Sequence, residues 1–377
     1  MSSFYNLIKK EYLNSKIKIN ISNSYKSLLN NLFNNIKNKY INVEPIYQYN
    51  ISNLTPIVRE IRDYTNKQSK FISPQIKNTI NKYIYTHRCI IENNTIYYFS
   101  KNKSLTNSEK NNIKKALLRI KVLKNYFNNE MEVNIGIYPT HFKKTINKIR
   151  KKLIPLGANN VNSGLTFYRL GEKKNGTIIL WRLEEMNKVI IHELFHSIKV
   201  DMGLILNEDI FEPYMKKKYN LDKFIGINES YIETLACIFN VILYVIENKL
   251  SKNEFIVRIK YEIFYSITKA SQILNYYGLS NLNDLIQEKH IKFIQNSNIF
   301  SYYILKLFIL YNFNKVIIIL FNQKCLNNNL IIEESEKCSQ NYLNIISNIY
   351  NKSLDNMISY IIENKDFINS SLRMTIH

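Results

Sequence analysis

The sequence is poor in glycine, proline and tryptophan. Its 377 residues include 8 Gly, 6 Pro and 1 Trp, whereas Asn, Ile, Lys and Tyr are heavily used. This bias is typical of AT-rich coding sequences, so composition is a poor guide to the fold. With 45% apolar residues, the chain can bury one large core or two smaller ones, and chains beyond about 250–300 residues usually divide into domains. We expect two or three subdomains.

Cysteine is also scarce. The four cysteines, Cys89, Cys237, Cys325 and Cys338, lie far apart and form no CxxC pair. This spacing argues against a disulfide framework and against a zinc site made of thiolates. A reducing compartment is the natural interpretation.

Long apolar segments are missing as well. The N-terminus, MSSFYNLIKKEYLNSK, lacks the apolar core of a signal peptide. The longest apolar runs, 302–311 and 316–321, are shorter than the ~20 residues that a membrane helix needs. We expect a soluble, intracellular protein with no transmembrane segment.

Positive charge is in excess. The 52 Lys and Arg against 30 Asp and Glu give a formal net charge of +22, which would attract a polyanion such as nucleic acid. The alternative is that the lysines follow the coding bias and form a solvated face. The basic residues are scattered through predicted helices, and net charge alone does not decide between the two interpretations.

The pattern of apolar residues predicts an α+β protein that is mostly helical. We expect an N-terminal α+β region at 1–130, a subdomain at 131–225 with a small antiparallel sheet or hairpin before a long helix, and a helical subdomain at 226–377. The oligomeric state is not encoded in these patterns.

Several elements have local signals. Thr106 followed by Glu109 predicts a helix start, and an amphipathic segment continues to Phe127. The segment 89–100 has two β-rich runs around an Asn-Asn pair, and the runs 165–170 and 177–183 are separated by Gly-Glu-Lys-Lys-Asn-Gly, so each predicts a hairpin. The helix predicted next spans 184–200 and ends before Gly203.

This last helix contains the sequence His192-Glu193-Leu-Phe-His196. Residues four apart project from one side of a helix, so the two imidazoles can direct one nitrogen each at a single Zn²⁺ about 2.0–2.1 Å away. Glu193 lies beside them, where its carboxylate could take a proton from water that the metal acidifies. Chance matches to this pattern are expected only roughly 0.008 times in a chain with this content of His and acidic residues.

Two histidines leave zinc one protein ligand short of the usual catalytic three. Glu229 and Glu233 lie four residues apart in an otherwise apolar predicted helix. Acidic pairs on helices are most often exposed, but the apolar neighbours make exposure the weaker interpretation here.

The two motifs together, HELFH at 192–196 and NESYIE at 228–233, resemble the gluzincin group of zincin metallopeptidases. The resemblance implies a zincin-like catalytic domain, with Glu229 as the third zinc ligand and Glu233 accepting a hydrogen bond from a liganding histidine. It covers about 70 residues, from the hairpin to Glu233. The missing HExxHxxGxxH continuation argues against a metzincin. The segments around 162–166, 181–185 and 188–193 are also similar to uncharacterised HExxH proteins of large DNA viruses, which implies association with virions or viral factories.

The resemblance also implies an edge strand that binds an extended peptide, and 177–182 stands in that position. The alternative is an ordinary edge strand without a ligand. It further implies an oxyanion donor some eighty to a hundred residues after HExxH, for which Tyr276, Tyr277 and His290 qualify by position. With 28 tyrosines in the chain, each of these can equally be a packing residue.

The favoured function is that of a zinc-dependent metallopeptidase, which hydrolyses polypeptides through a zinc-activated water with Glu193 as general base. Zinc-dependent hydrolysis of a non-peptide amide uses the same residues. The alternative from another class is a basic structural or nucleic-acid-associated protein, with an inactive zincin fold.

Overall fold

The computed structural model describes residues 3–41, 48–51, 56–67, 71–146, 154–168, 175–205, 208–223, 226–287, 291–348, 351–364, 367 and 370–377. The chain forms two compact units. The sheet unit comprises residues 33–144 and 162–199, and the helical unit comprises 1–32, 145–161 and 200–377. The division predicted at residues 130 and 225 stays a prediction.

The protein is a mostly helical α+β protein, as the sequence predicts. The elements of the sheet unit are β1 (Gln48–Ile51), α3 (Pro56–Lys67), α4 (Pro74–Ile80), β2 (Tyr85–Ile91), β3 (Asn94–Ser100), α5 (Asn107–Phe127), β4 (Glu132–Ile137), β6 (Gly164–Tyr168), β7 (Asn175–Leu180) and α7 (Met186–Ser197). Those of the helical unit are α1 (Ser3–Asn14), β5 (Leu156–Gly157), α6 (Ala158–Val161), α8 (Met202–Ile205), α9 (Glu208–Tyr219), α10 (Ile227–Glu247), α11 (Lys252–Tyr276), α12 (Asp284–Gln287), β8 (Gln295–Asn296), η1 (Phe300–Leu305), α13 (Lys306–Tyr311), α14 (Phe313–Asn322), α15 (Glu336–Ser347) and α16 (Lys352–Glu363). Helix α2 (Asn23–Ile41) crosses the boundary between the units.

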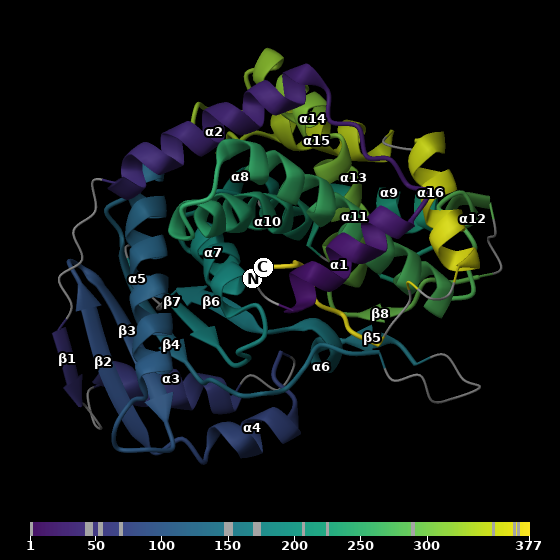
Figure 1. Ribbon diagram of the computed structural model, residues 1–377. Helices are drawn as coiled ribbons and strands as arrows, with labels where there is room; N and C mark the ends of the chain where they lie inside the picture. The colour runs from purple at the N-terminus through teal and green to yellow at the C-terminus, as the bar shows by residue number, and fades with distance from the viewer. Residues whose placement is uncertain are drawn as a thin grey trace. The chain divides into compact units, whose positions relative to one another are not determined.

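The sheet unit is built on one six-stranded sheet of order β1-β2-β3-β4-β7-β6 (Figure 1). The hairpins predicted for 89–100 and 165–183 are confirmed, because β2 pairs with β3 and β6 with β7 in antiparallel register. The first turn was predicted at Asn93 and Asn94, but Asn94 already belongs to β3. The sheet as a whole is mixed and not antiparallel, since β4 runs parallel to both β3 and β7.

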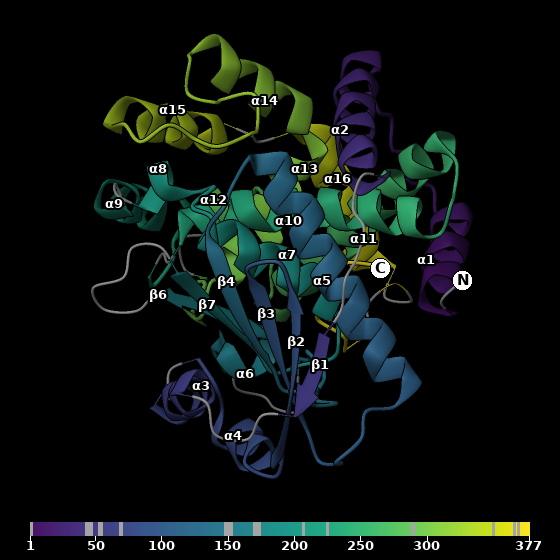
Figure 2. The ribbon, with the colours of Figure 1, turned by 90° about the vertical axis from the view of Figure 1, so that its left-hand side faces the viewer.

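Alternation along the strands assigns the two faces of this sheet. Alternate residues such as Tyr97, Phe99 and Ile179 point to one face and form a buried cluster with side chains of α3 and α4. Helix α5 packs on the other face against β2 and β3, and α7 packs beside it against β6 and β7 (Figure 2). Helix α7 is thereby fixed to the last two strands of the sheet.

The prediction that 177–182 forms an edge strand is wrong. Strand β7 lies between β4 and β6, with Val133 opposite Gly176 on one side and Phe167 opposite Thr177 on the other. The edge position next to α7 belongs to β6. The parallel β4–β7 pairing joins segments about forty residues apart, and local alternation carries no signal for it.

Helices α10 and α11 form the centre of the helical unit. Helix α10 packs against α11, α13 and η1, and its residues from Tyr231 to Leu243 are all buried. By length and composition, α10 could cross a membrane, as could the bent pair 300–311 and 313–322. The sequence interpretation missed α10 and treated the runs 302–311 and 316–321 of the bent pair as separate segments, each too short to cross a membrane. Since 83% of the apolar window of α10 is buried, the helix equally fits the core of a folded unit.

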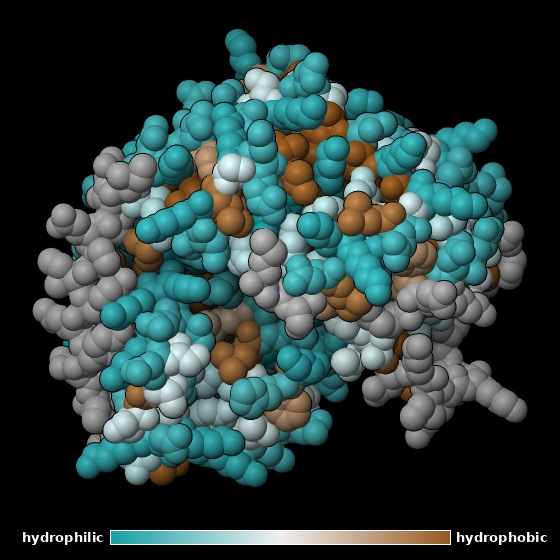
Figure 3. All heavy atoms as spheres, viewed as in Figure 1, coloured by the Kyte–Doolittle hydropathy of each residue, from teal (hydrophilic) through white to brown (hydrophobic). Residues whose placement is uncertain are grey.

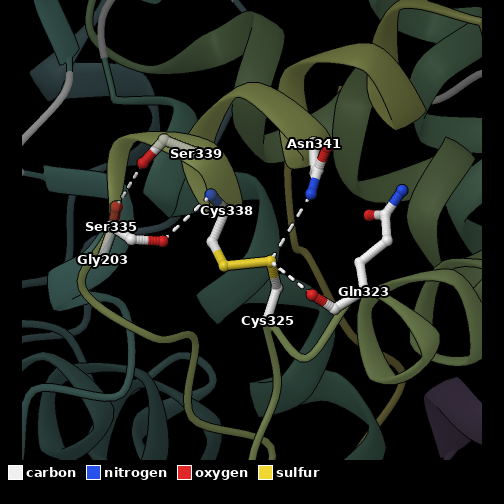
Figure 4. Close-up of a disulfide and its surroundings, with 7 residues drawn as sticks. All are labelled: Gly203, Gln323, Cys325, Ser335, Cys338, Ser339 and Asn341. Atoms are coloured by element: carbon white, nitrogen blue, oxygen red, sulfur yellow. Dashed lines mark hydrogen bonds between the residues drawn. A yellow bond between two sulfur atoms is a disulfide. The ribbon is translucent and has the colours of Figure 1, made fainter.

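The helical unit contains a disulfide between Cys325 and Cys338 (Figure 4). The expectation that the cysteines form no disulfide was wrong for this pair. The two residues are 13 positions apart, and the chain returns between them through an antiparallel bridge of Leu326 with Ile332. Cys89 and Cys237 are buried, and neither forms a disulfide within the described residues. The intracellular location stays a prediction.

Large apolar side chains at the surface are dispersed. Hydrophilic residues predominate on the face in Figure 3, and hydrophobic residues form separate patches there. The most exposed examples, Leu13, Ile84 and Ile154, belong to different segments of the chain. Isolated apolar side chains of this kind are normal on a protein surface.

Candidate metal centre

Helix α7 brings the two histidines of the HExxH motif together. The Nε2 atoms of His192 and His196 lie 3.2 Å apart, and the two rings meet edge to face at 74°. Two ligands of a tetrahedral zinc site, each about 2.0–2.1 Å from the metal, lie about 3.3 Å from each other. The spacing of the two nitrogens therefore fits two ligands of one zinc ion.

The rest of α7 anchors this pair in the sheet unit. Ile190, Ile191, Leu194 and Phe195 are fully buried, and the ring of Phe195 packs edge to face on Phe127 of α5. The sequence predicted a helix from 184 to 200, but α7 ends at Ser197 because Lys199 adopts a φ of +62°. Gly203, the predicted stop, lies within α8.

The start of α7 is held by contacts to the segment before Thr145. Glu185 occupies the N-cap position with a φ of +60° and no side-chain cap. Its carboxylate forms an ion pair of 2.9 Å with the ammonium of Lys144, and both side chains are buried. The main-chain N–H of Lys144 donates to Glu184 Oε2 at 2.7 Å, and that of Leu183 donates to the carbonyl of Thr140. These contacts set the direction in which the helix leaves β7.

Glu193 is buried next to the edge strand β6. The hydroxyl oxygen of Thr166 lies 2.8 Å from Glu193 Oε2 and 2.9 Å from the main-chain carbonyl oxygen of Glu193. Only 6% of the surface of Glu193 is exposed. The Glu193 carboxylate is thus held in place and largely shielded from bulk water.

Glu229 lies in the first turn of α10 and is held there by its neighbours. The side-chain amide of Asn298 donates to Glu229 Oε1 at 3.0 Å. Gly226, with a φ of +64°, occupies the N-cap position, and a Cβ on it would lie 2.6 Å from Glu229 Cγ. The preceding residue, Asn228, donates to the buried Asp201 Oδ2 at 2.7 Å. The carboxylate of Glu229 thus has a defined position at the start of α10.

Glu233 lies one turn after Glu229 and is fully buried. The thiol of Cys237, one further turn along, lies 3.9 Å from Glu233 Oε1. The prediction that this acidic pair is not simply exposed is confirmed, since Glu229 is half-buried. The predicted role of Glu233, accepting a hydrogen bond from a liganding histidine, stays a prediction.

Within the described parts of the chain, His192, His196 and Glu229 are the one group of three His, Cys, Asp or Glu side chains that could hold a metal ion. Two imidazoles and one carboxylate match the ligand set of a catalytic zinc site. The donor chemistry therefore fits zinc.

The tyrosines predicted by position as oxyanion donors have partners in the helical unit. Tyr276 donates to the carbonyl of Ile154 at 2.7 Å, and Tyr277 donates to that of Ile294 at 2.6 Å. Burial raises the pKa of the Tyr277 phenol well above its usual range. His290 lies outside the described residues. For all three, the oxyanion role stays a prediction.

Sequence reasoning missed Thr166, Gly226, Asp201 and Asn298, which surround the predicted residues. Thr166 lies 27 positions before Glu193, and Asn298 lies 69 positions after Glu229. Their spacing carries no periodic signal. Only the structure brings them to the carboxylates.

Comparison with known proteins gives no relative, because no protein-family model, curated protein or solved structure matches this chain. The resemblance to gluzincins thus depends on the two short motifs around His192 and Glu229.

Proposed function

We propose that the protein is a zinc-dependent metallopeptidase, with His192, His196 and Glu229 as metal ligands and Glu193 as general base. The observation that carries the proposal is the geometry of α7, where two imidazole nitrogens lie 3.2 Å apart. Glu193 is adjacent to His192 in the same helix, so a carboxylate accompanies the nitrogen pair.

Zinc bound by these residues would polarise a substrate carbonyl and make water a stronger acid. Glu193 would accept the proton of the attacking water and deliver it to the leaving amine. Its burial favours this shuttle, because proton transfer works best from a carboxylate that is fixed and partly dehydrated.

An extended polypeptide is the substrate that the sheet unit favours. Strand β6 pairs with β7 on one side and, among the described strands, has no partner on the other. An open edge of this kind can accept a peptide as an additional strand through main-chain hydrogen bonds. Thr166 belongs to this strand and contacts Glu193, so a peptide on β6 would lie next to the base.

The test combines metal analysis with cleavage of a peptide library. We expect one zinc per chain, no bound zinc in His192→Ala, and in Glu193→Gln retained zinc with activity lowered about 10²- to 10⁴-fold. Glu212→Gln, which changes a half-buried glutamate of α9, serves as the matched control and should remain active. Mapping of cleaved sites in a proteome, with wild type against Glu193→Gln, would identify the substrate.

Full cleavage by Glu193→Gln would overturn the assignment of the base. No peptide cleavage by the wild type, together with salt-sensitive binding to DNA or RNA, would support the nucleic-acid-associated alternative instead.

The third ligand has its own test. In Glu229→Gln, the amide oxygen can still accept from Asn298, but the negative charge is lost. We expect zinc affinity to fall at least about tenfold while the melting temperature changes little. Glu363→Gln, at the exposed end of α16, is the control and should bind zinc like the wild type. Equal affinity in the two variants would exclude Glu229 as a ligand.

A further inference from the structure

Strand β6 contacts Glu193 of α7 through Thr166. Thr166 Oγ1 lies within 2.9 Å of both Oε2 and the carbonyl oxygen of this residue. A hydroxyl has a single proton, so the two acceptors share it or take it in turn. In both cases, Thr166 connects Glu193 Oε2 to strand β6 through a short β-branched side chain, whose χ1 angle is restricted.

A second residue of β6 shapes the space for the same carboxylate. A Cβ on Gly164 would lie 2.8 Å from Glu193 Oε1 and 2.9 Å from Glu193 Cγ. It would also lie 2.7 Å from Cδ2 of Leu180 on the neighbouring strand. Atoms this close to a Cβ must move, so the observed position of Glu193 depends on a glycine at residue 164.

We infer that Thr166 and Gly164 are positioning residues for Glu193, with Thr166 binding one carboxylate oxygen and Gly164 leaving room for the other. The inference rests on the proposed function and concerns how its general base is held. The two residues are two positions apart on β6, so their side-chain positions share one face of the strand. They act on Oε2 and Oε1 separately, and together they restrict the carboxylate to one orientation.

Positioning matters because proton transfer depends on the distance and direction from the base to water. A displacement of about 1 Å from a productive geometry can lower a rate about 10²-fold. The same strand is also the open edge that would bind substrate. Thr166 therefore connects the base directly to the strand that would set the position of the peptide.

The test uses Thr166→Val, which keeps the shape of the side chain and removes the hydroxyl. We expect kcat to fall about 10- to 100-fold, with KM and the zinc content near wild-type values. Thr166→Ser, which restores the hydroxyl, should recover most of kcat. Thr95→Val makes the same substitution at a buried position of β3 and should keep full kcat. If Thr166→Val does not fold, Thr166→Ala provides the same comparison.

Gly164→Ala tests the second half of the inference. The added methyl group should displace the carboxylate and lower kcat, again with zinc retained. Crystal structures of Thr166→Val and Gly164→Ala give a readout that does not depend on activity, since we expect the Glu193 carboxylate to rotate away from its wild-type position. In a Glu193→Gln background, Thr166→Val should cause no further loss of rate.

The outcomes separate the two proposals. If Glu193→Gln is inactive but Thr166→Val keeps wild-type kcat, the positioning role is overturned and the peptidase stands. The positioning role is also overturned if Thr166→Val is slow while its Glu193 carboxylate has not moved. If Glu193→Gln is as active as wild type, the proposed function fails, and the role of Thr166 fails with it.

Discussion

Helices α7 and α10, which carry the candidate site, both begin differently from the capped helices of the protein. Glu185 before α7 and Gly226 before α10 have φ values of +60° and +64°, and neither helix has a side-chain cap. Helices α4, α5, α11, α15 and α16 instead begin with a Ser, Thr or Asn cap in an extended conformation. Deviations from local preference often mark functional sites, where tertiary contacts compensate for them.

The two unusual starts are stabilised in different ways. At α7, a glutamate accepts a conformation that is costly for a residue with a Cβ, and the buried pair of Glu185 with Lys144 holds it there. At α10, the residue is a glycine, and the space that a side chain would fill is taken by Glu229. The start of α7 therefore depends on an ion pair, and the start of α10 depends on the absence of a side chain at Gly226.

Loss of the buried ion pair at the start of α7 should lower the free energy of unfolding more than any other change proposed below. Lys144→Met leaves the carboxylate of Glu185 buried without its ammonium, and breaking a buried pair in this way costs about 3–5 kcal/mol. Lys121→Met removes the partner of Glu92, which is 57% exposed, and should cost about 0–1 kcal/mol. Urea unfolding of both variants measures the difference. Equal destabilisation would show that α7 does not depend on its buried pair.

Loss of the disulfide should give the next largest decrease in the free energy of unfolding, because the loop that it closes contacts α10. The carbonyl of Leu330 accepts from the hydroxyl of Tyr231 at 2.8 Å, and the chain continues into the bond between Cys325 and Cys338 (Figure 4). Closing a loop of this length stabilises a protein by about 3 kcal/mol. The double variant Cys325→Ser/Cys338→Ser should lose that amount in urea unfolding.

Reductant supplies the control for this variant. Dithiothreitol should lower the stability of the wild type to that of the double variant and leave the double variant unchanged. A wild type that is insensitive to reductant would mean that the bond contributes nothing to the fold.

Gly226→Ala tests the start of α10 with a smaller change in stability. A Cβ at a positive φ costs about 1–2 kcal/mol, and here it would also press on Glu229. Gly278 provides a matched control, because its φ is +79° and a Cβ there would meet nothing within 4 Å. Both alanine variants should be destabilised, but only Gly226→Ala should lose zinc affinity, as measured by titration with a chelator. Equal zinc affinity in the two variants would show that Gly226 does not position Glu229 for metal binding.

Local features of the fold and site could be predicted from the sequence. The spacing of His192 and His196 implies one helical face, and the structure places their Nε2 atoms 3.2 Å apart. Thr106 with Glu109 predicts the start of α5, which has the complete capping box. These signals succeed because each involves residues within one or two turns of each other.

The contacts that hold the site could not be predicted in this way. Glu185 carries no sequence signal for a positive φ, because its conformation depends on Lys144, which lies in another segment. Thr166 and Asn298 reach their glutamates from distant strands and loops, and Cys325 finds Cys338 only when the chain between α14 and α15 turns back. Tertiary packing decides such contacts, and periodicity within a segment does not report it.

Removal of the N-cap of α5 should give the smallest loss of stability, of the size usual for a helix cap. The Thr106 hydroxyl accepts from the N–H of Glu109 at 3.2 Å, and Glu109 Oε2 accepts from the N–H of Thr106 at 2.8 Å. Thr106→Ala removes half of this box and should cost about 1 kcal/mol in urea unfolding, whereas Thr106→Ser should cost little. Zinc affinity should stay unchanged, because α5 carries no ligand. If Thr106→Ala lost as much stability as Lys144→Met, the uncapped starts of α7 and α10 would not depend on tertiary contacts more than a capped start does.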